Sequence, residues 1–218
     1  MQIKYKEKSI DIIDKKIIGI VSNSVSNIIK FNENLGSEVY IISYFNVQNM
    51  NEGIVEDFLN AKKNEDMLPD ALKTLNINSK ILIKNICELS TSEKIKLLIV
   101  NALLKNYEVI YFDNILPCLD SSSRTRLYKL IIKLKKFQNK TILISDINID
   151  NIFEFVDNLI IVSDTIITGN KYDVFPCDII NNPITLTLRD KILENKNIDI
   201  GKVDSVNELI KAIYREIR

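Results

Sequence analysis

Histidine and tryptophan are absent from the 218-residue sequence, and glycine and proline are scarce. Without histidine, the chain has no imidazole for acid–base catalysis or for metal ligation. The three cysteines, Cys87, Cys118 and Cys177, stand far apart in the sequence. They form no pair of the metal-binding type, and their odd number argues against a disulfide framework. A reducing cytosol is therefore the simplest compartment to expect.

Long apolar runs and net charge are also missing. No apolar run reaches the ~18 residues of a transmembrane helix, and the opening residues MQIKYKEKSI lack the apolar core of a signal peptide. We therefore expect neither feature. Basic and acidic residues both number 29, so the net charge is zero and no nucleic-acid partner is expected. Basic runs such as Lys133–Lys136 are expected to form a solvated helix face.

The most informative stretch runs from Leu89 to Asp120. Ser90 and Glu93 form a capping box, which predicts a helix that starts directly after Ser90. Apolar residues then recur at helical spacing and give this helix one apolar face. The run VIYFD, Val109–Asp113, predicts a buried strand that ends in an aspartate. In open α/β sheets, ligands bind at that end of the strands.

Three motifs in this stretch resemble those of ATP-binding cassette (ABC) ATPases. LSTSE resembles the LSGGQ signature, VIYFD resembles the Walker B strand, and LPCLD resembles the D-loop with Asp120 in the aspartate position. Their order and gaps match the family's spacing, and the likeness extends from about Ala71 to Phe175. The resemblance implies an α/β, P-loop NTPase-like fold. Its parts would be a mostly parallel sheet with flanking helices, a small N-terminal antiparallel β part and a helical subdomain.

The resemblance also suggests a division of the chain. Residues 1–175 are expected to form a degenerate ABC ATPase-like domain, with the helical subdomain at about residues 50–106. Residues 176–218 are expected to form a C-terminal helical extension packed on the same domain. Near the N-terminus, Tyr5 is the candidate for the aromatic residue that stacks on adenine in the family. An edge-strand tyrosine is the interpretation we prefer.

Several groups with which the family binds ATP are replaced. The family's phosphate-binding loop needs glycines, a lysine for the phosphates and a hydroxyl for Mg²⁺. By alignment, Ser22, Val25 and Asn27 replace the glycines, Ile28 replaces the lysine and Ile29 replaces the hydroxyl. We expect an ordinary strand-to-helix turn that does not bind ATP tightly. Rescue by Lys30, two positions later, is the less favoured alternative.

The groups that hydrolyse ATP in the family are replaced as well. Asn114 stands where a glutamate polarises the attacking water, and an asparagine cannot accept a proton. The position of the switch histidine holds Asp146, or Ser145 in another register, and an acid there repels a γ-phosphate. Losing one catalytic donor costs ~10²–10³ in rate. We therefore lean against enzymatic activity and name no catalytic residue.

Part of what an ABC domain offers to its partner is kept, namely Ser90 and the helix start after it, whereas Thr91 and Ser92 replace two glycines of the signature. In the family, the signature of one subunit closes over ATP held by the other, and a helix start favours an anion. The resemblance implies the following site residues: Ser90, Thr91, Ser92 and Glu93 for the partner's ATP, Asp120 for the D-loop interface, Gln48 for the Q-loop and Asp113 for metal.

Three hypotheses about function remain open. The first is an inactive ABC transporter subunit, cytoplasmic and peripheral on the inner face of the cell membrane. It would form a heterodimer with a competent ABC ATPase, or a homodimer, beside a membrane-domain subunit, with ATP and Mg²⁺ at a composite site. The second is a soluble regulatory or scaffolding pseudo-ATPase without a transporter, and the third is a weak, unconventional ATP binder. We prefer the first because the kept groups are interface groups, whereas the lost groups serve the chain's own nucleotide.

Overall fold

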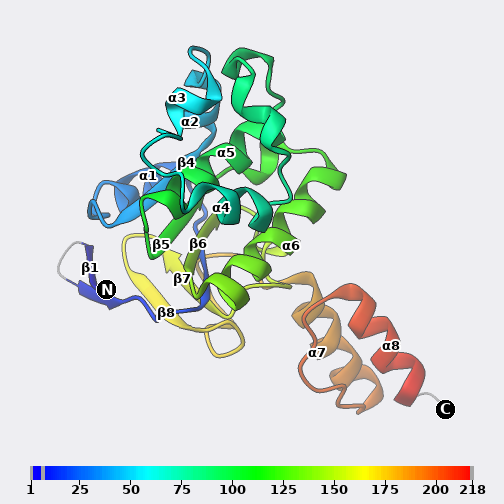
Figure 1. The fold of residues 1–218 in the computed structure, drawn as a ribbon. Helices are drawn as coiled ribbons and strands as arrows, with labels where there is room; N and C mark the ends of the chain where they lie inside the picture. Colours follow the sequence, from blue (N-terminus) through cyan, green and yellow to red (C-terminus); the bar gives the residue numbers. More distant parts are fainter. Residues whose placement is uncertain (1, 6–7, 217–218) are drawn as a thin grey trace. The chain divides into compact units, whose positions relative to one another are not determined.

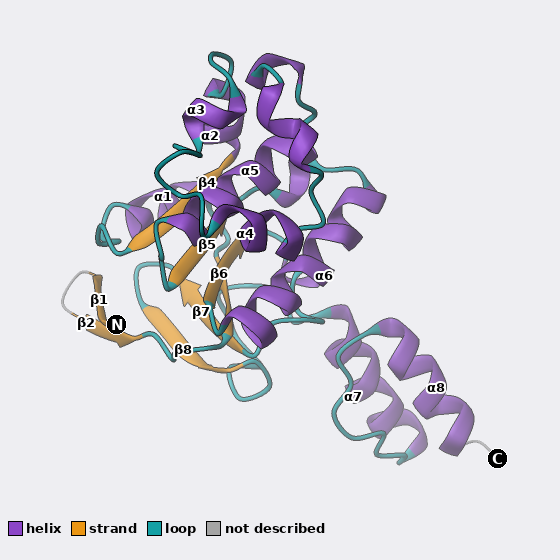
Figure 2. Ribbon diagram, in the orientation of Figure 1, coloured by secondary structure: helices purple, strands orange, loops and turns teal. Residues whose placement is uncertain are grey.

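The computed structural model describes residues 2–5 and 8–216. Its internal contacts divide the chain into two compact units, one made of residues 36–143 and the other of the segments on either side. Figure 1 labels helices and strands of both units where there is room, and Figure 2 colours the chain by secondary structure. Among the described residues, no helix is both long enough and apolar enough to cross a membrane.

The unit of residues 36–143 is built on parallel strands. Strand β4 (Val39–Ser43) pairs with β5 (Val109–Asp113), so that Ser43 lies opposite Asp113. Strand β6 (Thr141–Asp146) follows β5 in the strand order and passes out of the unit at its C-terminal end. The first four residues of β5 are buried, which confirms the predicted buried strand.

Residues 36–143 also contain five helices. They are α2 (Tyr44–Asn49), α3 (Val55–Phe58), α4 (Leu68–Thr74), α5 (Thr91–Leu104) and α6 (Ser121–Gln138), with 3-10 turns η1 (Ser79–Ile83), η2 (Ile86–Glu88) and η3 (Leu116–Cys118). Helix α5 begins after Ser90 as predicted. It does not have a single apolar face, because every residue from Leu97 to Leu104 is buried. A helix that is apolar all round belongs to a core.

Two short helices of this unit have clear local limits. Gln48, the Q-loop candidate, lies in α2, which begins where Ser43 and Asn46 make a capping box. Helix α3 ends before Asn60, which has φ 48 and so leaves the right-handed helical region.

The second unit contains the antiparallel pair β1 (Gln2–Tyr5) and β2 (Lys8–Asp11), which confirms the small N-terminal β part. Strand β3 (Ile17–Val21) runs parallel to β7 (Asn158–Val162), and β7 runs antiparallel to β8 (Ile166–Asn170). The strand order here is β6-β3-β7-β8. The fold is thus α/β with a mostly parallel sheet, as predicted.

The helices of the second unit are α1 (Val25–Asn32), α7 (Ile184–Lys196) and α8 (Val206–Glu216), with the short turn η4 (Ile149–Asn151). Helix α7 starts directly after Pro183. Helices α7 and α8 pack as a hairpin (Figure 1). Their small core contains three buried residues with three partly buried isoleucines: Val203, Leu209 and Ala212 with Ile192, Ile200 and Ile213.

A buried lysine connects this hairpin to the end of β8. The Nζ of Lys171 lies 2.6 Å from an oxygen of Asp204, which precedes α8, and also donates to the carbonyl of Phe153 at 3.0 Å. The hydroxyl of Tyr172 donates to the same Asp204 carboxylate. Burial raises the pKa of the Tyr172 phenol, so it remains a protonated donor. The hairpin is therefore held by charge as well as by apolar contact.

Candidate functional site

Ser90 and Glu93 close the start of α5. The Ser90 hydroxyl accepts a hydrogen bond from the Glu93 backbone N–H at 3.3 Å. In return, Glu93 Oε2 accepts from the Ser90 N–H at 2.9 Å and from the Ser90 hydroxyl at 2.8 Å. The hydrogen bond from the Ser90 backbone is the main reason why the pKa of the Glu93 carboxyl is lowered. The predicted capping box is confirmed, and it brings a negative charge to this helix start.

Asp120 closes the start of α6 in a similar way. Its Oδ1 accepts from the Ser123 N–H at 2.7 Å and from the Ser122 hydroxyl at 2.9 Å. These bonds, that of the Ser123 N–H first, lower the pKa of the fully exposed Asp120 carboxyl. Arg124 fixes the preceding turn, because its Nε donates to the carbonyls of Leu116 at 2.8 Å and Leu119 at 2.9 Å.

One hydrogen bond joins the two helix starts. The Ser92 hydroxyl donates to the Ser123 hydroxyl at 3.1 Å, and Ser123 also bonds Asp120 through its backbone. The structure thus brings together the predicted residues of the signature and of the D-loop. The sequence analysis missed Ser123. Its place as the third residue after a capping aspartate was the available signal.

This arrangement can receive an anion only in part. The first turn of a helix leaves N–H groups without intrahelical partners, here those of Thr91 and Ser92. The Ser90 hydroxyl, however, is already bonded to Glu93, whose carboxylate repels a phosphate. Lys84 partly offsets this charge, with its Nζ 3.8 Å from Glu93 Oε1.

Gln48 lies on α2 with an exposed side chain. Its backbone carbonyl accepts from the side-chain amide of Asn51 at 2.7 Å. The side-chain Oδ1 of Asn51 in turn accepts from Lys94 of α5 at 3.2 Å, which ties the segment after α2 to α5.

Asp113 ends β5 and accepts a hydrogen bond from the buried Tyr111 hydroxyl at 3.1 Å. Asn114 follows with φ 46, a left-handed conformation that asparagine adopts more readily than most residues. Within residues 2–5 and 8–216, no group of three or more His, Cys, Asp or Glu side chains is placed to hold a metal ion. Asp113 as a metal ligand stays a prediction.

The turn after β3, in the other unit, pairs its polar groups internally. Only three residues separate β3 from α1, and the first of them, Ser22, is fully buried. Its hydroxyl accepts from the Ser24 N–H at 3.2 Å and from the Asn27 side-chain amide at 3.3 Å. Ile28 is buried, whereas Lys30 is exposed. The chain therefore forms a short strand-to-helix turn here, as predicted.

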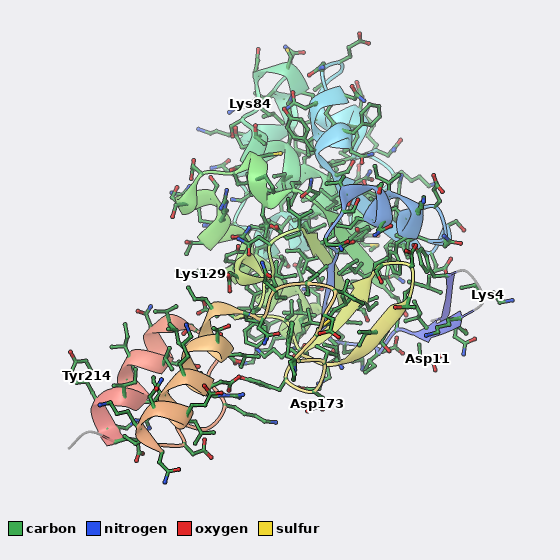
Figure 3. The ribbon with its side chains drawn as sticks, turned by 180° about the vertical axis from the view of Figure 1, so that it is seen from behind. Lys4, Asp11, Lys84, Lys129, Asp173 and Tyr214 are labelled. Atoms are coloured by element: carbon green, nitrogen blue, oxygen red, sulfur yellow. The ribbon has the colours of Figure 1, made fainter. Side chains whose placement is uncertain are left out.

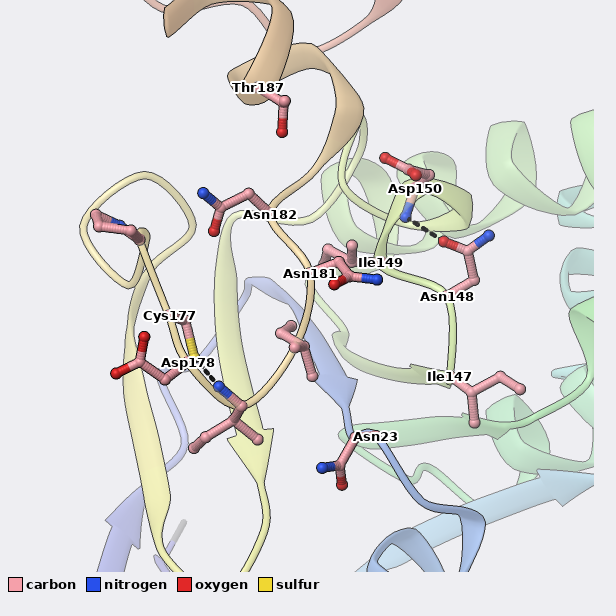
Figure 4. A pocket seen from close by; sticks show the side chains of 13 residues that line it. Asn23, Ile147, Asn148, Ile149, Asp150, Cys177, Asp178, Asn181, Asn182 and Thr187 are labelled. Atoms are coloured by element: carbon pink, nitrogen blue, oxygen red, sulfur yellow. Dashed lines mark hydrogen bonds between the residues drawn. The ribbon is translucent and has the colours of Figure 1, made fainter.

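A polar cavity of about 1050 Å³ opens beside this turn (Figure 4). Asn23 of the turn, the residues that follow β6 and the segment 176–182 line it. The lining includes the carboxylates of Asp150 and Asp178 but no lysine or arginine. Such a cavity lacks the positive charge that would stabilise a triphosphate.

Two further residues of this unit are used within the fold. Asp146, 1% exposed at the end of β6, accepts from the Asn148 N–H at 2.8 Å and from the Asn151 side chain at 3.0 Å. Tyr5 is 3% exposed, and its ring lies 5.8 Å from that of Phe31. Tyr5 is thus a core residue of its unit, at the end of β1.

Curated relatives of the chain are ATP-binding proteins, although no model of a known protein family matches it. The zinc import ATP-binding protein ZnuC of Ehrlichia chaffeensis is 30% identical over 135 residues, 59% of this chain and 54% of that protein. The energy-coupling factor transporter ATP-binding protein EcfA1 of Fusobacterium nucleatum is 30% identical over 132 residues, 60% of this chain and 49% of that protein. The chain thus spans about half the length of these relatives.

Solved structures show the same fold. CbiO1 from Clostridium perfringens, described as part of the ABC transporter complex cbiONQ, has a TM-score of 0.62 at 17% identity and covers 89% of this chain and 92% of its own. An ATP-binding cassette of an ABC transporter in its ADP conformation has a TM-score of 0.61 at 15% identity, over 78% of this chain and 91% of its own. The fold is that of an ATP-binding cassette domain. The curated relatives that the chain resembles in sequence are ATP-binding proteins of ABC type.

Proposed function

We propose that the chain is a non-hydrolysing ABC subunit of a membrane transporter that completes the nucleotide site of a competent ABC ATPase. One observation carries the proposal. The exposed starts of α5 and α6 are joined by the Ser92–Ser123 hydrogen bond. In the turn at Ser22, by contrast, the serine hydroxyl is hydrogen-bonded to groups of the same turn. The relatives named for zinc import and for energy coupling support a role in transport. The subunit would lie in the cytoplasm, against a membrane-domain subunit.

In the proposed complex, the partner holds ATP and Mg²⁺ in its own phosphate-binding loop. The start of α5 approaches the terminal phosphate with the N–H groups of Thr91 and Ser92. Asp120 lies at the same edge, because the Ser92–Ser123 bond joins the two helix starts. Glu93 has to release the Ser90 hydroxyl if that hydroxyl is to donate to the phosphate.

Calorimetry tests the proposal. Mg-ATP is titrated into the chain alone, into an ABC ATPase that binds ATP but carries a substitution that prevents hydrolysis, and into the mixture of both. We expect no binding to the chain alone and tighter binding to the mixture than to the ATPase. Ser90→Arg should abolish the gain. Ser37→Arg, which places the same group at an exposed position before β4, should retain it.

Two outcomes would contradict the proposal. If the mixture shows no gain, the composite site does not form with that class of partner, and the role without a transporter becomes preferable. Micromolar ATP binding by the chain alone would show that the turn at Ser22 accepts phosphate.

Glu93→Gln makes a second, opposite test. This variant removes the carboxylate that faces the expected phosphate but leaves a carbonyl oxygen to cap Ser90. Removing one charge at hydrogen-bonding distance should tighten ATP binding in the mixture by roughly five- to tenfold. Glu88→Gln removes the same charge from an exposed residue outside the cap and should change binding less than twofold.

A further inference from the structure

A cleft of about 440 Å³ lies within the unit of residues 36–143 and is lined by the end of α4, the first half of α5 and one face of α6. Its apolar lining consists of five residues: Leu75, Ile95, Leu119, Leu127 and Leu130. Four of them are buried, but Leu130 is only partly buried. Leu130 keeps some exposure because it faces this cleft.

The same cleft carries an excess of positive charge. Four cationic side chains line it, together with one carboxylate, that of Glu93. Three of the cations, Arg126, Lys129 and Lys133, are spaced by three and four residues along α6 and so share one helix face. The fourth, Lys96, lies on α5. We expected the basic run that begins at Lys133 to be a solvated face, but Lys133 lines this cleft.

Two of these cations are available to a ligand. Arg126 and Lys129 are exposed, and within the described part of the chain neither forms an ion pair. Lys129 projects outward from the ribbon in Figure 3. Lys133 is used differently, because its Nζ donates to the backbone carbonyl of Thr74 at the end of α4.

Hydrogen bonds hold the walls of the cleft at both ends. At one end, the Ser92 hydroxyl of α5 bonds the Ser123 hydroxyl of α6 at 3.1 Å. At the other end, Lys133 bonds the Thr74 carbonyl, and the Gln138 side chain donates to the Thr74 hydroxyl at 3.3 Å. The cleft is therefore formed without a ligand, which reduces the cost of binding one.

We propose that this cleft binds an amphipathic organic anion. The alkyl or aromatic body packs on Leu127 and Leu130, while a phosphate or carboxylate head lies among Lys96, Arg126 and Lys129. The volume falls within the ~300–1,000 Å³ that is usual for small-molecule sites. This inference does not depend on the proposed pairing with an ATPase. A ligand here would nevertheless contact Ser90 and Ser92, which line the same cleft.

Calorimetry of the full chain with decyl phosphate tests the proposal. We expect saturable binding that weakens by about two- to fourfold for each methylene removed from the alkyl chain, because each one removes apolar surface from the contact. Inorganic phosphate alone should not bind measurably. Arg126→Glu/Lys129→Glu should weaken decyl phosphate binding at least tenfold. Lys62→Glu/Lys63→Glu changes the net charge equally at exposed positions outside the cleft, and its binding should stay within twofold of wild type.

Leu130→Gln probes the apolar wall separately from the charges. It should weaken decyl phosphate binding several-fold and flatten the dependence on chain length, since a polar side chain then faces the alkyl body. Circular dichroism spectra verify that each variant is folded. Binding of decyl phosphate to the Arg126/Lys129 charge-reversal variant with wild-type affinity would overturn the proposal, and so would an affinity independent of chain length.

Vesicles separate the two sources of such an anion. If the wild-type chain co-sediments with phosphatidylglycerol vesicles and the charge-reversal variant does not, the ligand is a lipid headgroup. Phosphatidylcholine vesicles are the neutral control. Decyl phosphate binding without vesicle binding would identify a free amphiphile. If decyl phosphate does not bind at millimolar concentration, the proposal is wrong.

Discussion

The turn at Ser22 and the starts of α5 and α6 are junctions of the same kind, and they use their polar groups in opposite ways. At the first, a buried serine hydroxyl satisfies the amides of its own turn. At the second, Ser90 and Asp120 cap their helices and remain exposed. The turn at Ser22 carries no carboxylate, whereas the helix starts carry those of Glu93 and Asp120. The capping groups of the helix starts are also exposed, and this exposure allows them to meet a partner molecule.

Replacing Ile28 with lysine should produce the largest effect. The alignment puts the family's phosphate-binding lysine at this position, but Ile28 is 3% exposed. Burying a lysine there should lower the free energy of unfolding by about 3–5 kcal/mol, from lost apolar packing and the cost of the charge. Ile29→Lys is the matched control. This neighbour is 53% exposed, so its substitution should cost less than about 0.5 kcal/mol.

Urea unfolding of the two variants gives the measurement. Equal stability for both would mean that the Ile28 side chain can turn outward, as a phosphate-binding lysine must. The turn at Ser22 would then differ much less from the starts of α5 and α6 in its ability to meet a phosphate than the structure indicates.

Local patterns in the sequence predicted much of this molecule. The S-x-x-E pattern gave both the start of α5 and the bonds within its cap, because such bonds join residues three positions apart. The apolar run before Asp113 gave β5 for a similar reason. The bond from Ser92 to Ser123 joins residues 31 positions apart, and nothing in their spacing predicts it. The cleft beside Leu130 depends on how three helices pack, so it too needed coordinates.

Asp120→Ala should measurably lower the free energy of unfolding. The aspartate is the residue that satisfies the Ser123 N–H at the start of α6, and loss of a helix cap destabilises a fold. Ser122→Ala removes only a hydroxyl donor to the same carboxylate and should cost less than half as much. Chemical denaturation measures both. Equal losses would show that the Asp120 carboxylate contributes nothing as a cap.

A double-mutant cycle on Ser92 and Ser123 should show a smaller effect. Each alanine substitution removes one partner of the hydrogen bond that joins α5 to α6. We expect a coupling free energy of about 0.5–1 kcal/mol, since both hydroxyls are partly buried. A coupling near zero would mean that the two helix starts are held together by apolar packing alone. The starts of α5 and α6 would then be held less rigidly relative to each other than we infer.

The smallest predicted effect concerns the charge of Glu93 and its dependence on pH. The pKa of this carboxyl is lowered from an ordinary value of 4.5, chiefly by its hydrogen bond with the Ser90 backbone. A lowered pKa in the folded state means that the stabilisation is fully present above pH 4.5 and is lost as the pH falls through the folded-state value. Glu93→Gln should therefore lower the melting temperature by about 1–2 °C at pH 7 and by less as the pH drops below 4.

Thermal melts of both proteins between pH 7 and pH 3 measure this difference. Other carboxyls with a lowered pKa, such as that of Asp120, titrate in both proteins and cancel in the comparison. A difference that stays constant with pH would show that the stabilisation lost in Glu93→Gln does not depend on the negative charge of Glu93. A difference that shrinks on acidification locates the charge at the α5 start, and this is the charge that opposes a phosphate at Ser90. The Glu93 charge would then both stabilise the start of α5 and weaken the binding of a phosphate there, which has no counterpart at the turn at Ser22.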